Sequence, residues 1–131
     1  RVYTPAGWTE QGKYALEIGV KAVEYFEEFF GIKYPLKKLD LISLHEMHVR
    51  AMENWGCITF ADYVLLNDLE TQPTALLMRN ARTIAHEIAH MWFGNLVTMD
   101  WWTDIWLNEG FARFMEFQAL SVIHPEYNIW D

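Results

Sequence analysis

Apolar residues recur at the i, i+3, i+4 spacing of a helix face in three stretches of the chain. The first stretch, 9–30, predicts a helix that ends at Gly31. The second, 73–93, predicts a long helix that opens with a proline and is capped by Gly94. The third, 108–122, predicts a final helix. The apolar stripe of the first helix comprises Tyr14, Ile18, Ala22, Tyr25, Phe26 and Phe29.

Strand patterns occupy the region between the first two helices. Residues 39–43 alternate between the two faces, and the run 57–66 (CITFADYVLL) predicts a further strand or a pair of short strands. Residues 96–98 predict a short extended piece. Because strands come before the later helices, the order of elements predicts an α+β fold.

Length and composition limit the class of protein. The chain has 131 residues, of which 52% are hydrophobic, so we expect 1–131 to be a single folded domain and an excerpt of a longer chain. The formal net charge of -8 argues against nucleic acid and anionic membrane as partners, and no apolar run reaches membrane-spanning length. The single cysteine, Cys57, excludes an internal disulfide and favours a cytoplasmic location.

The second predicted helix carries the candidate chemistry. With Ile84 at zero and 100° per residue, His86 and His90 fall at about 200° and about 240°, opposite the apolar face, and Glu87 falls beside them. Two imidazoles one turn apart can bind one zinc ion, and a carboxylate between them can act as a general base on a zinc-activated water. The alternative is an ordinary amphipathic helix whose solvent-exposed face carries two histidines by chance.

Two carboxylates of the final helix extend this arrangement. Glu109, in Leu107-Asn108-Glu109-Gly110, can complete a His2Glu zinc site. Glu116 lies two turns further along the same face and can accept a hydrogen bond from a ligand histidine. The alternatives are a first-turn glutamate favoured by the helix dipole for Glu109 and a solvated side chain for Glu116.

Three motifs in order resemble the gluzincin aminopeptidases, the aminopeptidase N family. These are AMENWG at 51–56, HEIAHMWFGNLVT at 86–98 and WWTDIWLNEGFA at 101–112. The lead-in YFEEFFGIKYPLKKLDLI matches that family's run into the first motif, and TMDWWT with HPEYNIWD is most similar to its puromycin-sensitive cytosolic branch. The resemblance covers nearly the whole chain and implies the central part of a thermolysin-like catalytic domain.

The resemblance also implies roles for individual residues. His86, His90 and Glu109 would bind one zinc ion per chain, and Glu87 would be the general base. Glu53 would bind the free α-amine of a peptide substrate. The remaining residues that would line the substrate are Ala51, Met52 and Asn54.

The chain departs from the family pattern in two ways. Arg50 stands where the family has a glycine, and it could crowd the amine site, select an acidic substrate side chain or point to solvent. The family's oxyanion-stabilising tyrosine lies beyond these residues, and that role is not assigned to Tyr127. The family's N-terminal β-domain and C-terminal helical domain are also absent. We therefore expect the isolated 131 residues to self-associate and to turn over little or no substrate.

Other chemistry-bearing residues have simpler interpretations. His45 and His48 are more typical of a polar loop than of a pocket lining. Cys57 is interpreted as a small apolar residue. Four tryptophans are expected in the core and the floor of the site: Trp92, Trp101, Trp102 and Trp106.

The predicted function is therefore removal of N-terminal residues from peptides by a zinc enzyme. An endopeptidase of the same clan and a non-catalytic peptide-binding or scaffold fragment remain the alternatives. Cleavage of an N-blocked peptide would identify an endopeptidase. Metal content, together with turnover of an aminoacyl reporter, would distinguish an enzyme from a non-catalytic fragment.

Overall fold

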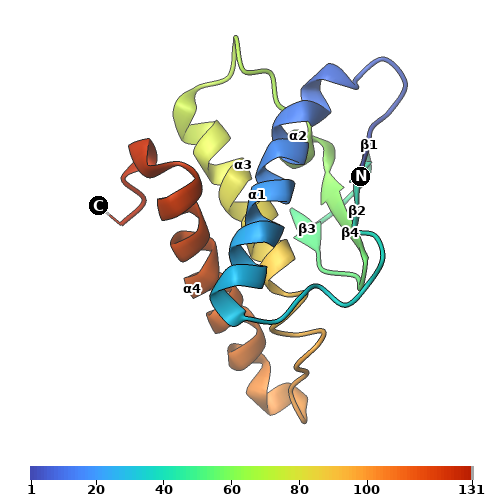
Figure 1. Cartoon of the computed structure of the whole chain (residues 1–131). Coiled ribbons are helices and arrows are strands. Elements are labelled where there is room, and N and C mark those ends of the chain that lie inside the picture. The colour runs from blue at the N-terminus through green and yellow to red at the C-terminus, as the bar shows by residue number, and fades with distance from the viewer. Residues whose placement is uncertain (131) are drawn as a thin grey trace.

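The computed structural model describes residues 1–130 as a four-stranded sheet covered by helices (Figure 1). The elements are β1 (Val2–Tyr3), a 3-10 turn (Glu10–Gly12), α1 (Lys13–Phe30), β2 (Asp40–Leu44), β3 (Ala51–Met52), β4 (Cys57–Ala61), α2 (Asp62–Leu65), α3 (Thr74–Ala89), a 3-10 turn (Trp102–Asp104), α4 (Ile105–Ile123) and a 3-10 turn (Pro125–Tyr127). This mixture of helix and strand agrees with the predicted α+β class.

Helix α1 follows its predicted stripe closely. Its buried residues recur every three or four positions, in two places as adjacent pairs, and it ends at Gly31, which adopts the left-handed conformation with φ 64°. Phe29, a predicted member of the stripe, is 53% exposed. It lies at the edge of the buried face, so the face is narrower than the apolar pattern suggested. The fully buried stripe residues are Ile18, Ala22 and Phe26.

The sheet has the strand order β1-β2-β4-β3. β2 pairs in parallel with both β1 and β4, whereas β3 runs antiparallel to β4 and forms an edge. The strand predicted to continue to residue 66 instead stops at Ala61, and α2 begins at Asp62. Asp62 accepts a hydrogen bond from Ser43 of β2, and the helical turn that follows buries Val64 and Leu65. An acidic residue in the first turn of a helix is favoured by its dipole.

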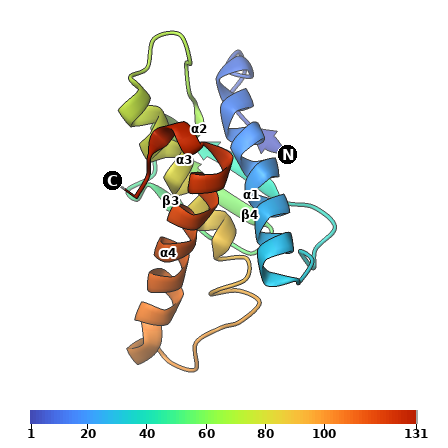
Figure 2. The ribbon, with the colours of Figure 1, turned by 60° about the vertical axis from the view of Figure 1, so that its left-hand side comes forward.

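Helix α3 packs against both α1 and α4, and the sheet lies behind these three helices in the view of Figure 2. Its predicted core face is confirmed, with Ala81, Ile84 and Ile88 fully buried. The prediction that the helix continues to residue 93 is wrong, because α3 ends at Ala89. Beyond it the chain tightens into turns, and the backbone N–H of Trp92 donates to the carbonyl of Ala89.

The tryptophans divide into two groups. Trp92 is buried, and its indole N–H donates to the carbonyl of Ile32, as a core residue should. Trp101, Trp102 and Trp106 are 63%, 66% and 65% exposed, so they do not lie in the core, and their expected place in the floor of the site stays a prediction. They belong to the loop before α4 and its first turn, which project beyond the rest of the molecule (Figures 1 and 2).

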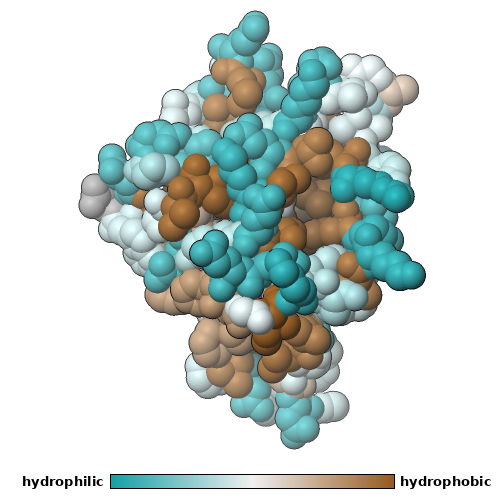
Figure 3. Space-filling model, in the orientation of Figure 1, coloured by the Kyte–Doolittle hydropathy of each residue, from teal (hydrophilic) through white to brown (hydrophobic). Residues whose placement is uncertain are grey.

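Apolar side chains gather on the surface around the beginning of α4 (Figure 3). Ile105 and Phe111 are among the exposed hydrophobic residues there. Exposed apolar patches of this kind favour association. Self-association of the isolated chain remains a prediction. Among the helices of residues 1–130, none is both long and apolar enough to cross a membrane.

Candidate metal centre

Helix α3 presents two imidazoles to one point. His86 and His90 are one helical turn apart, and their Nε2 atoms lie 3.1 Å from each other. His86 is partly exposed, whereas His90, the C-cap residue of α3, is 1% exposed. The spacing of one helical turn therefore brings the two imidazoles together on one face of α3.

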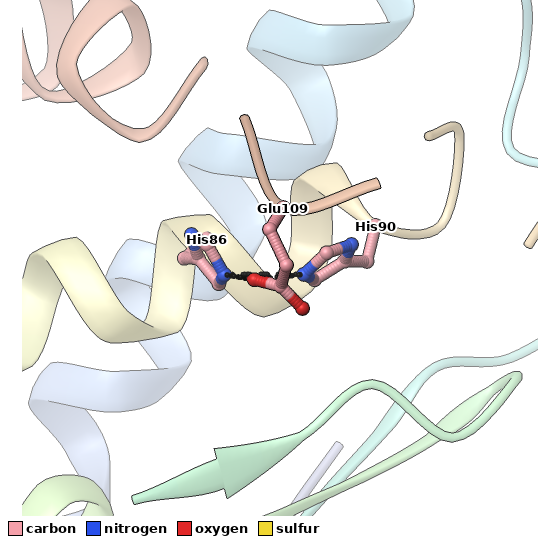
Figure 4. Close-up of side chains that lie close together, drawn as sticks. All are labelled: His86, His90 and Glu109. Atoms are coloured by element: carbon pink, nitrogen blue, oxygen red, sulfur yellow. Dashed lines mark hydrogen bonds and ion pairs between the residues drawn. The ribbon is translucent and has the colours of Figure 1, made fainter. Parts of the chain in front are cut away.

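Glu109 of α4 supplies the third group. Its Oε2 atom lies 3.2 Å from Nε2 of His86 and 3.8 Å from Nε2 of His90 (Figure 4). A tetrahedral zinc ion with bonds of about 2.0–2.2 Å separates its ligand atoms by about 3.3–3.6 Å. The three atoms are thus spaced as zinc ligands are, and two nitrogens with one carboxylate oxygen form a donor set that zinc uses.

The protons on the two imidazoles favour a cation at this point. Nδ1 of His90 is 2.9 Å from the carbonyl oxygen of Phe93, to which only an N–H can donate. The neutral His90 ring therefore directs the lone pair of Nε2 toward the cluster. Nδ1 of His86 faces Oε2 of Glu116 at 2.9 Å, which likewise favours a proton on Nδ1 and a lone pair on Nε2. Two lone pairs and a carboxylate then meet, an arrangement that a metal ion stabilises.

Glu116 is buried behind His86 rather than solvated. It is 2% exposed and accepts two hydrogen bonds from Arg82, while Arg113 approaches the same oxygen at 2.9 Å. Burial opposes protonation of His86, but the carboxylates of Glu116, Glu87 and Glu109 outweigh it and raise its pKa. Glu116 therefore orients the ring and stabilises charge on it.

Glu87 points into the same region from α3. It is 6% exposed, and burial raises its pKa to about 8, with further increases from the nearby carboxylates of Glu53 and Glu109. His86 acts in the opposite direction. A divalent cation at the cluster would favour the ionised form and lower this pKa.

Glu53, which follows β3, lies beside Glu87. Carboxylate oxygens of both residues and a ring nitrogen of His90 lie within 4.8 Å of one another. Asn108 donates to the Glu53 side chain at 3.3 Å, and Asn95 donates to its backbone carbonyl at 2.8 Å. Across residues 1–130, no lysine or arginine forms an ion pair with Glu53 or Glu87, so the pair can receive an external cation.

The other residues predicted to line the substrate lie in β3 and in the turn that follows it. Ala51 and Met52 form the edge strand β3, which leads into Glu53. The amide of Asn54 donates to the carbonyl of Met52 and to Thr59, and so holds the turn between β3 and β4. Substrate contacts by these residues remain predictions.

Arg50 extends toward α3. Its guanidinium donates to Thr83 and Asn80 and lies 5.5 Å from the ring centroid of Tyr63. The sequence left three possibilities for Arg50: crowding of the amine site at Glu53, selection of an acidic substrate side chain, and exposure to solvent. The first and the third do not agree with these contacts. Selection of an acidic substrate group remains.

The two loop histidines lie outside the cluster. His48 is exposed, and the His45 side chain is 89% exposed with Nδ1 3.0 Å from Asp62. The sequence reasoning missed four residues around the cluster: Arg82, Arg113, Asn95 and Asn108. For Arg82 a signal was present, because it precedes His86 by one helical turn; the two asparagines carried no comparable spacing.

Gly94 lies in the turn that follows α3, next to His90 and to Asn108 of α4. Its φ is +124°, and an added Cβ would overlap the side-chain oxygen of Asn108 and approach Nδ1 of His90 at 3.2 Å. Gly94→Ala is therefore expected to lower the free energy of unfolding by at least about 1–3 kcal/mol, the usual cost of a strained backbone position. Urea unfolding measures this difference.

Gly110 provides the matched control for that substitution. It is exposed within α4, and an added Cβ there meets nothing within 4 Å. Gly110→Ala should preserve or raise stability by up to about 1 kcal/mol, since alanine favours helix. Equal stability of Gly94→Ala and the unmodified protein would show that this turn is not constrained as described.

Comparison with known proteins places this arrangement in a family. The chain is 51% identical to a puromycin-sensitive aminopeptidase of Caenorhabditis elegans, 48% identical to human endoplasmic reticulum aminopeptidase 1 and 45% identical to aminopeptidase M1 of Arabidopsis thaliana. Each match covers 99% of this chain and 14% or 15% of the relative. The chain thus spans about one seventh of the length of these relatives. The similar identities do not assign it to the puromycin-sensitive branch, and the expected cytoplasmic location stays a prediction.

A family model agrees with these relatives over most of the chain. The model described as the peptidase family M1 domain matches residues 14–131. The match includes all three motifs and every residue of the candidate metal centre. This chain belongs to peptidase family M1.

Proposed function

We propose that this chain forms the centre of a zinc aminopeptidase that removes residues from the N-terminus of peptides. In this proposal His86, His90 and Glu109 hold the zinc ion, Glu87 is the general base and Glu53 binds the substrate amine. The observation that carries it is the convergence of three ligand atoms beside Glu53 and Glu87, with which no lysine or arginine of residues 1–130 forms an ion pair. The thermolysin-like catalytic domain is part of the same proposal.

Glu87 is suited to move a proton. A bound zinc ion supplies Lewis acidity that polarises a water molecule and the scissile carbonyl. Glu87 accepts a proton from the attacking water and transfers it to the departing amine. Burial makes Glu87 a stronger base than an exposed glutamate, because it raises the pKa. A general base works best with a pKa near the working pH.

Glu53 accounts for the selection of N-termini. An ammonium group beside Glu53 neutralises its carboxylate, whereas an internal peptide bond brings no charge and leaves Glu53 uncompensated. Asn108 and Asn95 hold Glu53 from two sides. This preference for a free amine is what distinguishes an aminopeptidase from an endopeptidase of the same clan.

Two residues support the proposed ligand His86 from behind, namely Glu116 and Arg82. Arg82 fixes Glu116 through two hydrogen bonds, and Glu116 in turn faces Nδ1 of His86. Such a carboxylate fixes the ring orientation and makes the opposite nitrogen a better ligand.

The proposal predicts that the complete protein carrying this chain hydrolyses an alanyl reporter and leaves its N-acetylated form intact. Glu53→Gln should lower kcat/KM for the free-amine reporter by about 10–100-fold, the value of a hydrogen bond between charged groups. Steady-state kinetics with both reporters measures this. Cleavage of the acetylated reporter, or of an internal bond in an N-blocked peptide, would indicate an endopeptidase. A zinc-loaded protein without any turnover would indicate a scaffold.

A further inference from the structure

A pocket of about 570 Å³ lies next to the candidate metal centre. Four of the five arginines of the chain line it, although the chain as a whole carries a net charge of -8. These arginines come from the segment before β3, from α3 and from α4, which are far apart in the sequence. The four are Arg50, Arg79, Arg82 and Arg113.

Two of these arginines already have a carboxylate partner. Arg82 and Arg113 both bind Glu116. Arg50 donates only to the neutral groups of Thr83 and Asn80, and Arg79 forms no ion pair with any residue from 1 to 130. Arg50 and Arg79 therefore bring positive charge into the pocket that the described protein does not neutralise.

The two unpaired guanidiniums are close enough to affect each other. Burial lowers the pKa of Arg50, and the charge of Arg79 lowers it further. Arg50 is partly buried and Arg79 is exposed, and two like charges that line one pocket are unfavourable unless an anion joins them. Arginine is the side chain best suited to bind a carboxylate through two parallel hydrogen bonds.

The pocket lies on one side of the reacting groups. Its lining includes Ala51, His86 and Glu87, whereas Glu53 and His90 are not part of it. If Glu53 holds the amine of a substrate and Glu87 faces the first peptide bond, the chain beyond that bond continues into the pocket. This step rests on the proposed function.

We infer that Arg50 and Arg79 recognise a carboxylate in the part of the substrate that follows the first peptide bond. The carboxylate belongs either to an acidic side chain of the second residue or to the C-terminus of a dipeptide. Both sources present the same group to the arginines, and they differ in how far it lies from the cleaved bond.

Three peptides separate the two sources in the complete protein that carries this chain. Alanyl-glutamyl amide presents only the side-chain carboxylate, alanyl-glutamine presents only the C-terminal one, and alanyl-glutaminyl amide presents neither. We expect kcat/KM for at least one of the two anionic peptides to exceed that of the neutral peptide about 10-fold or more, as for one charge-assisted hydrogen bond.

Variants test whether the arginines cause this preference. Arg79→Gln, at an exposed position, and Arg50→Gln should each reduce the ratio between anionic and neutral peptides toward one. Arg79→Gln keeps the test valid if Arg50→Gln disturbs folding through its contacts with α3. Arg1→Gln is the matched control, because Arg1 lies beside a different pocket, and it should leave the ratio unchanged.

The outcomes distinguish this inference from the proposed function. Equal kcat/KM for all three peptides, or a preference that survives Arg79→Gln, overturns the inference and leaves the aminopeptidase intact. If no peptide is hydrolysed, the proposed function fails, and calorimetry on the unmodified protein then compares the affinities of the same peptides. Equal affinities overturn the inference as well, whereas tighter binding of an anionic peptide that Arg79→Gln abolishes supports it.

Discussion

Glu87→Gln is expected to keep the zinc ion in the complete protein and to lower kcat about 10²–10⁴-fold. Glutamine has nearly the same shape, but its amide cannot accept the proton of the attacking water. The three proposed ligands remain in place, because Glu87 is not among them. Metal analysis of the purified variant, together with steady-state kinetics, measures both effects.

Glu109→Gln is the matched comparison for that result. It makes the same chemical change in the same site, but at a proposed ligand, so it should lose zinc as well as turnover. Near-normal turnover by Glu87→Gln would mean that another group acts as the base.

His86→Ala is expected to remove most of the bound zinc. We expect one zinc per chain in the unmodified protein. Loss of a hydrogen-bond partner behind a metal ligand already costs about 10–100-fold in affinity, and loss of the ligand itself should cost more. Binding needs neutral imidazoles, so affinity should also fall as the pH is lowered through the range in which histidine titrates. Metal analysis after dialysis at several pH values measures both.

His45→Ala provides the control for His86→Ala. Its side chain is 89% exposed and contacts Asp62, well outside the cluster, so this variant should retain full zinc. Full zinc content in His86→Ala would rule out the proposed ligand set.

The local features of the site could be predicted from the sequence because they depend on helix geometry alone. A spacing of four residues places His86 and His90 on one face of any α-helix, and the apolar stripe that includes Ile84 and Ile88 places another face of that helix in the core. The end of α1 at Gly31 is local in the same way, because glycine readily adopts a left-handed conformation. The motif order was enough to identify the family.

Local patterns were insufficient where two conformations suit the same residues. The run CITFADYVLL is apolar enough for one long strand, yet Asp62 bonds to Ser43 of the neighbouring strand and the chain turns into α2. The predicted end of α3 failed for a related reason, since the residues after Ala89 are apolar but form turns around the side chain of His90.

Only the tertiary structure decided which distant groups meet. Glu53 lies beside Glu87 because the edge strand β3 pairs with β4 and brings its end to the face of α3. Glu116 is buried because Arg82 of α3 packs against it from another helix. The sequence by itself thus determined the helix periods, the end of α1 at Gly31 and the spacing of the two histidines, all of which depend on neighbours a few residues away. Other features depend on how whole elements pack, and no short-range pattern encodes that packing. These features are the direction of Arg50, the exposure of three tryptophans, and the convergence of three carboxylates with two imidazoles.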